Sequence, residues 1–381
     1  MTVRALSKTN HAAFRSLVLF CAVLAASLAH AEEVTDLAGR TVTIERPAET
    51  IVVGDGRILS AIALLDRKDP LHRVKALLSD LRLTDGDLLS TLSTHFERMK
   101  TLPIYAGKGD SVSAETIISL APDAAVFGLQ DHGPGASNTE LIAQLEEAGT
   151  TVVFIDFRQH PMENTVPSIA LLGKLLGRQK EAREYTDFYE AHRERIAKRV
   201  AGFTGERPTV FLHAHPGRFD CCVGMANGML GPFVTLAGGR NISAAVTPAV
   251  VGRHTLEFVL AEDPDVWIGT ASGSIEDFEA GRPIVVLGTR SSDEIAHASL
   301  QAALEADGLE ALSAVQAGRA HAIWHNFYNS PLNIYALESF AKWLHPDLFA
   351  DLDPDETLKE IHRRFLGYPL NGLYSVSLAD D

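Results

Sequence analysis

One unit of secondary structure recurs in two distant parts of this sequence. Residues 115–127 read as a helix, a Pro-Asp pair and a buried strand, and residues 257–268 repeat the arrangement. In both copies a glutamate, Glu115 or Glu257, stands seven residues before the Pro-Asp pair. Helix-Pro-Asp-strand is also a common way to leave a helix, so chance similarity is the competing interpretation. Two regions built on one plan explain both copies better.

Along most of the chain, short apolar runs alternate with segments whose apolar residues recur at helical spacing. A short hairpin is expected at 36–44, and strands are expected at 51–53, 125–127, 152–155, 210–212, 266–268 and 284–287. Strands that alternate with helices favour mostly parallel sheets covered on both faces. The sequence therefore predicts an α/β fold of two Rossmann-like lobes.

The connection between the two series of strands is helical. Residues 162–177 carry apolar side chains near helical spacing, and Pro167 falls early enough for the first turns to tolerate it. Residues 180–200 form a further amphipathic helix. We expect an N-terminal lobe at 32–160, one interlobe helix at 161–178 and a C-terminal lobe at 179–381. A helical connection resists bending, so the lobes should rock by a modest angle.

The first residues have the features of an export signal. Three basic residues precede an apolar run at 17–28, which ends in Ala29-His30-Ala31. The run is shorter than the roughly 20 residues that span a bilayer. Cys21 follows Phe20, whereas lipoprotein signals need a small residue there. We expect cleavage after Ala31 and a mature protein in the periplasm.

Charge and cysteine content argue against a nucleic-acid-binding protein and against a fold stabilised by disulfides across long loops. Removal of the signal takes three basic residues with it, so the net charge of −15 becomes −18. So acidic a surface makes nucleic acid an unsuitable partner. The remaining cysteines, Cys221 and Cys222, are neighbours and can close no long loop. Burial of apolar surface must therefore supply the stability.

Several segments, in this order and spacing, resemble the binding proteins of ABC importers for iron-siderophores, haem and cobalamin. The resemblance covers nearly the whole mature chain and rests on residues 36–42, 48–52, 113–123, 171–177 with Glu181-Ala182, and 237–241.

This resemblance implies two lobes joined by one long helix, with the ligand in the cleft between them and no enzymatic turnover. It implies a monomer without a cofactor, whose ligand carries Fe³⁺, and a permease dimer in the inner membrane as partner. Glu115 and Glu257 match the two glutamates that dock into the permease subunits. A solvated carboxylate favoured by the helix dipole is the alternative for each.

Ligand-binding residues are expected in loops that follow the strands, because open α/β sheets bind ligands there. Arg57, Arg158 and Arg218 each follow a predicted strand, and guanidinium groups suit the oxygens of an anionic chelate. A surface role is the alternative for each arginine. His325 and Tyr328 could approach iron or stack on a flat ligand, or pack under the last strand.

The histidines at the end of the strand at 210–212 should point in opposite directions. His213 and His215 alternate, so both cannot face the cleft, and we assign His215 to the ligand. No set of converging ligands predicts a bare metal site. Cys221 and Cys222 could form a small disulfide ring that stiffens a cleft loop, or remain two buried thiols.

Three questions stay open at this stage. Residues 66–103 extend beyond the family's short forms, look helical, and could cover the cleft or enlarge the first lobe. The ligand could be a ferric siderophore or, alternatively, haem or cobalamin, with Tyr105 or Tyr328 as an axial haem ligand. A periplasmic enzyme is disfavoured, because the sequence lacks a G-x-S-x-G elbow, a P-loop and a G-x-G-x-x-G motif.

Overall fold

The computed structural model describes residues 31–78, 81–105, 112–130 and 133–379. The expected export signal lies outside the described residues, apart from Ala31. Within these ranges no helix combines the length and the apolar character that a membrane crossing requires.

The N-terminal lobe is built on a parallel sheet with strand order β4-β3-β5-β6. The predicted hairpin precedes it as β1 and β2, which pair antiparallel. The elements are β1 (Glu32–Thr35), β2 (Thr41–Ile44), β3 (Ile51–Val53), η1 (Gly56–Ile58), α2 (Leu59–Leu65), β4 (Val74–Leu77), α3 (Leu81–Thr84), α4 (Gly86–His95), η2 (Glu97–Thr101), α5 (Ala114–Ser119), β5 (Ala124–Gly128), α6 (Thr139–Glu147), β6 (Thr151–Ile155) and α7 (Pro161–Leu175).

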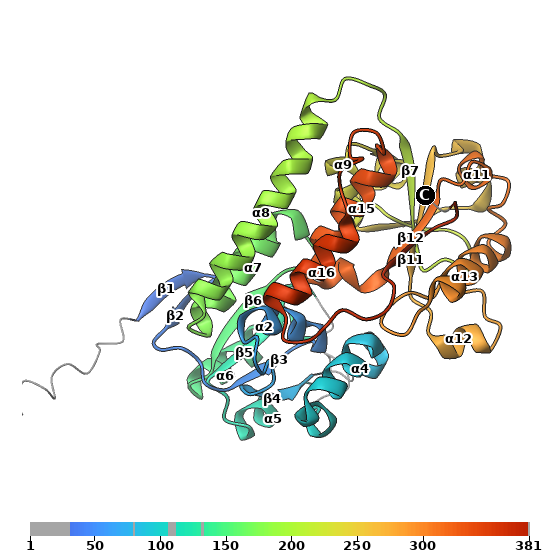
Figure 1. Cartoon of the computed structure of the whole chain (residues 1–381). Helices are drawn as coiled ribbons and strands as arrows, with labels where there is room; N and C mark the ends of the chain where they lie inside the picture. The colour runs from blue at the N-terminus through green and yellow to red at the C-terminus, as the bar shows by residue number, and fades with distance from the viewer. Residues whose placement is uncertain (1–30, 79–80, 106–111, 131–132, 380–381) are drawn as a thin grey trace, which may run out of the picture.

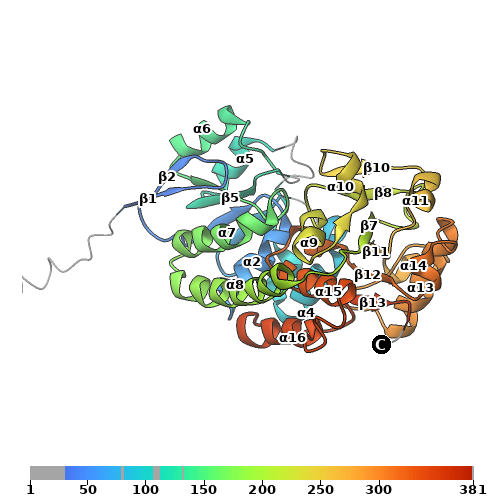
Figure 2. The ribbon, with the colours of Figure 1, turned by 90° about the horizontal axis from the view of Figure 1, so that it is seen from above.

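Both faces of this sheet are buried, which explains its uninterrupted apolar strands. Alternate residues point to opposite faces: Val126 packs with α2 and α7, whereas Phe127 packs with α5 and α6. Figure 2 shows α5 and α6 on one side of the sheet and α7 on the other.

The C-terminal lobe has a mixed sheet with strand order β10-β8-β7-β11-β12-β13, and β9 pairs with β7. Its central strands β7, β11 and β12 are parallel. The elements are β7 (Thr209–Ala214), β8 (Val223–Met225), α9 (Gly231–Leu236), β9 (Arg240–Asn241), α10 (Ile242–Val246), β10 (Val251–Arg253), α11 (Leu256–Glu262), β11 (Val266–Ala271), α12 (Ile275–Glu279), α13 (Asp293–Ala306), α14 (Ser313–Gln316), β12 (Ala320–Trp324), η4 (His325–Asn329), η5 (Pro331–Asn333), α15 (Ile334–Leu344), α16 (Pro354–Phe365) and β13 (Ser375–Ser377).

Helix α8 (Gln179–Gly202) contacts both lobes. It packs against α2 and α7 at one end and against α9 and α15 at the other. The expected interlobe helix at 161–178 corresponds to α7, which packs on β6 and α2 of the N-terminal lobe. The division of the chain at residues 160 and 178 stays a prediction, but the connecting contacts belong to the next helix.

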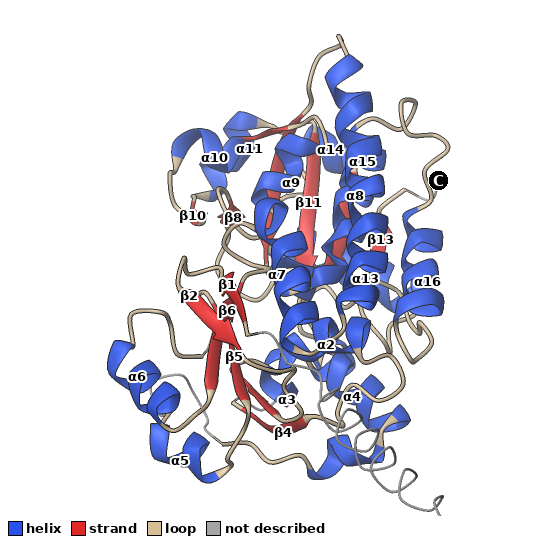
Figure 3. Cartoon of the chain, turned by 90° about the vertical axis from the view of Figure 1, so that its left-hand side faces the viewer, coloured by secondary structure: helices blue, strands red, loops and turns tan. Residues whose placement is uncertain are grey.

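The connection is also thicker than one helix. α15 runs beside α8, and α16 reaches α2 of the N-terminal lobe (Figure 1). One apolar cluster accordingly contains residues of both lobes, including Val53, Tyr189 and Phe340. Figure 3 shows the two sheets one above the other with these helices along one side. Such a layer should restrict the lobes to small relative rotations.

Two sequence predictions of secondary structure were wrong. Residues 74–77, placed in a helical stretch, form the edge strand β4. Residues 284–287, predicted as a strand, are buried but form only an isolated bridge between Val286 and Gly273. Short apolar runs do not distinguish a strand, a helix and a buried loop, because burial alone makes them apolar.

Candidate functional site

A cavity with a volume of about 830 Å³ lies between the two lobes. It is found at the carboxyl ends of β3, β7, β11 and β12, where open α/β sheets bind ligands. The N-terminal lobe contributes Arg57 and residues of the 82–90 segment, and the C-terminal lobe contributes the loops that follow its three parallel strands. The volume is in the range of sites for small organic ligands.

The turn that carries Arg57 depends on two glycines. A β-carbon at Gly54 would lie 2.5 Å from Cδ1 of Phe127, and one at Gly56 would lie 2.5 Å from Cγ of Leu81. Only glycine fits such close approaches without displacing a neighbour. Asp55, between them, accepts a hydrogen bond from the Arg57 backbone N–H at 2.9 Å and so begins the short η1 helix.

The Arg57 side chain links the two lobes. It is only 3 % exposed, and its Nε and Nη2 donate to the two carboxylate oxygens of Asp55 at 3.0 and 2.7 Å. Its Nη1 donates to the hydroxyl of Tyr328, and its guanidinium lies 5.1 Å from the centre of that ring. Asp55 therefore balances the charge of Arg57, and the bidentate pair fixes the direction of the guanidinium. Arg57 and Tyr328 both line the cavity.

Arg158 lies behind Tyr328 and is absent from the cavity lining. Its guanidinium is 5.8 Å from the centre of the Tyr328 ring, and its Nη1 donates to the carbonyl of Gln130. Asp156 holds this loop by accepting from the backbone N–H of Arg158 at 2.9 Å and of Gln159 at 2.8 Å. The structure thus places Arg158 where it supports the tyrosine.

Two histidines meet at the wall of the cavity. The rings of His215 and His325 have centroids 3.9 Å apart, and each Nδ1 pairs with a hydroxyl, that of Ser272 at 2.8 Å and that of Thr270 at 2.9 Å. Burial, then the charge of Arg218, lowers the pKa of His215 to about 4. Burial and nearby positive charges also lower the pKa of His325. Both imidazoles are therefore neutral near pH 7 and can accept or donate hydrogen bonds.

His215 also has an unusual backbone conformation. Its φ of 55° is left-handed, which costs a non-glycine residue about 1 kcal/mol or more. The conformation ends β7 and turns the following loop toward the cavity. Arg218 of that loop lines the cavity, donates from Nε to the Ser272 hydroxyl at 3.1 Å, and lies 3.6 Å from Asp277.

The inserted segment at 66–103 supplies part of the cavity wall. Asp85 and Asp87, at the start of α4, line it, and sequence reasoning did not identify them. Asp85 caps α4 by accepting from the Leu88 N–H at 2.9 Å, and burial raises its pKa to about 7 despite this bond. An Asp followed by a helical run is the signal of a helix cap. Nothing local indicates that this cap faces a cleft.

Asp87 joins the insertion to the C-terminal lobe. One carboxylate oxygen accepts from the Thr289 N–H at 3.0 Å, and the other accepts from the indole N–H of Trp324 at 3.3 Å. The side-chain amide of Asn326 donates to the carbonyl of Thr84 at 3.1 Å. The insertion therefore lines the cleft and contacts the opposite wall, which answers the question that the sequence left open.

Glu115 and Glu257 lie outside the cavity, on the surface of different lobes. Each is exposed in the first turn of its helix, and each helix is capped by a hydroxyl two residues earlier, Ser113 for α5 and Thr255 for α11. Figure 3 shows α5 and α11 at opposite ends of the molecule. This placement keeps the two carboxylates available to a second protein.

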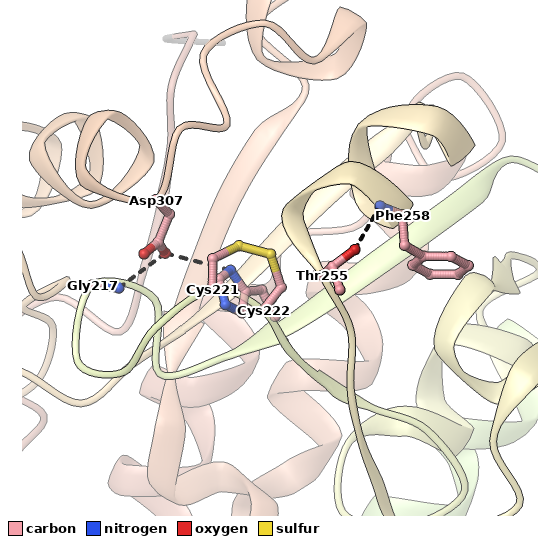
Figure 4. The surroundings of a disulfide bond; sticks show 7 residues. Gly217, Cys221, Cys222, Thr255, Phe258 and Asp307 are labelled. Atoms are coloured by element: carbon pink, nitrogen blue, oxygen red, sulfur yellow. Dashed lines mark hydrogen bonds and ion pairs between the residues drawn. A yellow bond between two sulfur atoms is a disulfide. The ribbon is translucent and has the colours of Figure 1, made fainter.

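Cys221 and Cys222 are joined by a disulfide between adjacent residues (Figure 4). The pair ends the loop that carries His215 and Arg218, and Cys222 exchanges two backbone hydrogen bonds with His254, at 3.0 and 2.8 Å. Neither cysteine lines the cavity. The ring closes the loop from behind, and its effect on the stiffness of the loop stays a prediction.

Two other candidates of the sequence analysis lie elsewhere. Tyr105 donates its hydroxyl to the carbonyl of Val53 at 3.1 Å and is not part of the cavity wall. His213 is a buried residue of β7 and does not line the cavity either. The sequence predicted no metal site, yet the described residues bring His213, Cys221 and Cys222 together.

A family model described as periplasmic binding protein matches residues 51–321 of the chain. No curated protein sequence matches the chain significantly.

Solved structures match the whole fold. A TroA-like periplasmic binding protein, FepB, from Veillonella parvula is 25 % identical, with a TM-score of 0.79 over 91 % of this chain and 99 % of that one. The molybdate-bound periplasmic protein MolA of Haemophilus influenzae is 18 % identical, with a TM-score of 0.66 over 90 % and 99 %. The periplasmic heme-binding protein RhuT from Roseiflexus is 20 % identical, with a TM-score of 0.54 over 79 % and 99 %. The last two show the fold alone.

Proposed function

The chain belongs to the periplasmic binding protein family, and on this premise we propose that it captures a ferric siderophore-type chelate and delivers it to an ABC importer. As a member of this family it is a solute-binding protein of an importer and not an enzyme. The specific ligand and the docking residues are the proposed part.

The observation that carries the choice of ligand is the cavity of about 830 Å³ with basic side chains from both lobes. Arg57 and Arg82 reach it from the N-terminal lobe, and Arg218 and Arg290 reach it from the C-terminal lobe. An anionic chelate would gain charge-assisted hydrogen bonds from such groups. The neutral imidazoles of His215 and His325 add donors and acceptors without adding charge.

A metal-bearing macrocycle, haem or cobalamin, is the second candidate. The similarity to a heme-binding protein supports it, as does the cluster of tilted rings that His215, His325 and Tyr328 form at the cavity wall. A small oxyanion such as molybdate, the ligand of the MolA structure, would leave most of the cavity empty. The volume therefore favours the larger ligands.

Trp324 lines the cavity, so its fluorescence can report ligand binding. Titration of the purified chain with ferric catecholate, hydroxamate and carboxylate siderophores should quench tryptophan fluorescence for one class. Haem should give no shifted Soret band, and molybdate should give no quenching. Haem binding with a shifted Soret band and no response to any siderophore would favour the second candidate.

Substitution of one arginine tests whether charge-assisted hydrogen bonds contribute to ligand binding. Arg218→Ala should weaken binding about 10- to 100-fold, since a hydrogen bond to a charged group contributes about 1.5–3 kcal/mol. Arg363→Ala, an exposed arginine of α16, is the matched control and should bind like the wild type. Equal affinity of both variants would contradict the assignment of Arg218.

Docking is tested separately from binding. Glu115→Ala with Glu257→Ala should leave ligand affinity intact and abolish uptake, because the carboxylates are exposed and lie outside the cavity. Glu147→Ala with Glu262→Ala removes two exposed acids of α6 and α11 and should leave uptake unchanged. Equal loss of affinity and uptake in the first variant would contradict the docking role.

The proposal includes export to the periplasm with cleavage after Ala31. The first described strand, β1, begins at Glu32, directly after the expected cleavage point. N-terminal sequencing of the protein from its own host should return Glu32-Glu33-Val34. A chain that keeps residues 1–31 in the cytoplasmic fraction would contradict this expectation.

A further inference from the structure

We propose that His213, Cys221 and Cys222 form a binding site for a thiophilic metal ion of the zinc type when the disulfide is reduced. One ring nitrogen of His213 and the two sulfur atoms lie within 4.8 Å of one another. Imidazole nitrogen and cysteine sulfur are the ligands that Zn²⁺ prefers in proteins. The site is separate from the cleft, because none of these three residues lines the cavity.

His213 has a buried ring nitrogen without a hydrogen-bond partner among the described residues. It lies on β7, is 2 % exposed, and packs against the rings of Phe211 and Trp267. This ring nitrogen is Nδ1. A buried polar atom left unpaired costs about 1–3 kcal/mol, so such atoms require an explanation. An ion between Nδ1 and the two sulfurs would satisfy it.

A carboxylate lies beside the same nitrogen. Oδ2 of Asp307 is 3.8 Å from Nδ1 of His213, and it accepts a hydrogen bond from the Gly217 N–H at 3.0 Å (Figure 4). Two ligand atoms at about 2.1 Å from one tetrahedral ion lie about 3.4 Å apart. The observed separation is close to that value, so Asp307 brings negative charge to the position that a cation would occupy.

The disulfide gates this site. A disulfide sulfur is a poor ligand, whereas a thiolate is a strong one. Two electrons and two protons from a dithiol reductant break the bond between the sulfurs of Cys221 and Cys222, and the reductant becomes a disulfide. The binding of Zn²⁺ then releases two protons as both thiols become thiolates.

The site lies at the base of a cleft loop. His213 precedes the loop that carries His215 and Arg218, and Cys221 and Cys222 follow it. Either the disulfide or a bound ion therefore acts behind the wall that holds Arg218. The proposed ion is distinct from any metal that a transported ligand carries.

Co²⁺ is the probe, because thiolate coordination gives it a charge-transfer band in the near ultraviolet. The purified mature chain is reduced with a phosphine under argon, titrated with Co²⁺, and then titrated with Zn²⁺. We expect saturation at one equivalent of Co²⁺ and loss of the band when Zn²⁺ displaces it. The unreduced chain serves as its own control and should show no band.

Variants decide which residues hold the ion. Cys221→Ser with Cys222→Ser should abolish the band, and His213→Gln should weaken Zn²⁺ affinity at least about tenfold. His321→Gln is the matched control, because His321 is also buried but pairs with the Ser377 hydroxyl at 2.8 Å. Circular dichroism checks that each variant folds. If His213→Gln does not fold, the serine variant alone decides.

Three results would overturn the proposal. They are the absence of a charge-transfer band in the reduced wild-type chain, a band of equal intensity in the serine variant, and metal binding that is independent of reduction. None of them bears on the proposed transport function, because siderophore and haem titrations are made on the unreduced chain.

Discussion

The two lobes share one hydrogen-bonded joint between a strand and the Pro-Asp turn. In the N-terminal lobe, Oδ2 of Asp123 accepts from the backbone N–H of Thr50 at 2.8 Å and from its hydroxyl at 2.9 Å. In the C-terminal lobe, Oδ2 of Asp265 accepts from the same two groups of Thr209, both at 2.7 Å. The backbone N–H of each aspartate donates back to the threonine hydroxyl, at 3.1 and 2.9 Å.

The cleft walls of the lobes differ despite this common joint. The N-terminal wall contains Arg57, the buried carboxyl group of Asp85 and the half-buried one of Asp87. The C-terminal wall contains the neutral imidazoles of His215 and His325 beside the guanidinium groups of Arg218 and Arg290. A repeated scaffold thus positions loops of unlike chemistry, which is how one fold comes to bind many ligands.

The largest expected effects on stability come from core substitutions, one in each lobe. Phe127→Ala and Phe211→Ala should each lower the free energy of unfolding by about 3–5 kcal/mol, because both rings are fully buried. The rings belong to clusters confined to one lobe each. Hydrogen exchange should therefore show the greater loss of protection in the mutated lobe. Equal loss throughout both lobes would mean that the lobes unfold as one unit.

The shared joint should contribute equally in both lobes. Asp123→Ala and Asp265→Ala should each cost about 1–3 kcal/mol, because a threonine N–H and hydroxyl lose their acceptor. Asp187→Ala, which removes an exposed acid of α8, should change stability by less than about 0.5 kcal/mol. Denaturant unfolding measures all three. A large difference between the first two variants would contradict the structural equivalence of the joints.

This contribution should depend on pH with a definite sign. Burial alone would raise the pKa of both aspartates, but the hydrogen bonds from Thr50 and Thr209 and the nearby arginines outweigh it and lower the pKa below the usual 3.8. The stabilisation is therefore present above pH 4 and is lost as the pH falls through the lowered pKa values. The difference in free energy of unfolding between the wild type and each alanine variant should therefore become smaller below pH 4.

The contribution of Asp85 to stability should depend on pH with the opposite sign. Its pKa is raised from 3.8 to about 7 by burial, so the folded protein holds a proton there that the unfolded chain has lost. Stability should fall as the pH rises from about 4 to 7.

The Asp85→Asn variant stays neutral and keeps an oxygen for the Leu88 N–H, so it should gain about 1–2 kcal/mol on the wild type between pH 5 and pH 8. Thermal unfolding at the two pH values measures the gain. Asp220→Asn, at an exposed loop position, is the control and should show no such gain. If the stability difference between Asp85→Asn and the wild type is the same at pH 5 and pH 8, the assignment of a buried, protonated Asp85 is contradicted.

Much of the fold could be read along the chain. The echo of Glu115 to Asp123 in Glu257 to Asp265 predicted two related lobes, and it corresponds to two equivalent capped helices and joints. The alternation of His213 and His215 predicted different surroundings for the two rings, and His213 is buried on β7 whereas His215 lines the cavity. These features depend on local periodicity and turn chemistry, which adjacent residues encode.

The site required contacts between distant parts of the chain. Asp87 meets Trp324 across the cleft, the Tyr328 ring contacts both Arg57 and Arg158, and α8 packs against helices of both lobes. Sequence spacing carries no information on such pairs, because burial and cross-lobe hydrogen bonds arise only when the lobes pack together. Local pattern therefore specified two α/β lobes and most of their central strands, whereas packing between the lobes established which side chains share the cavity.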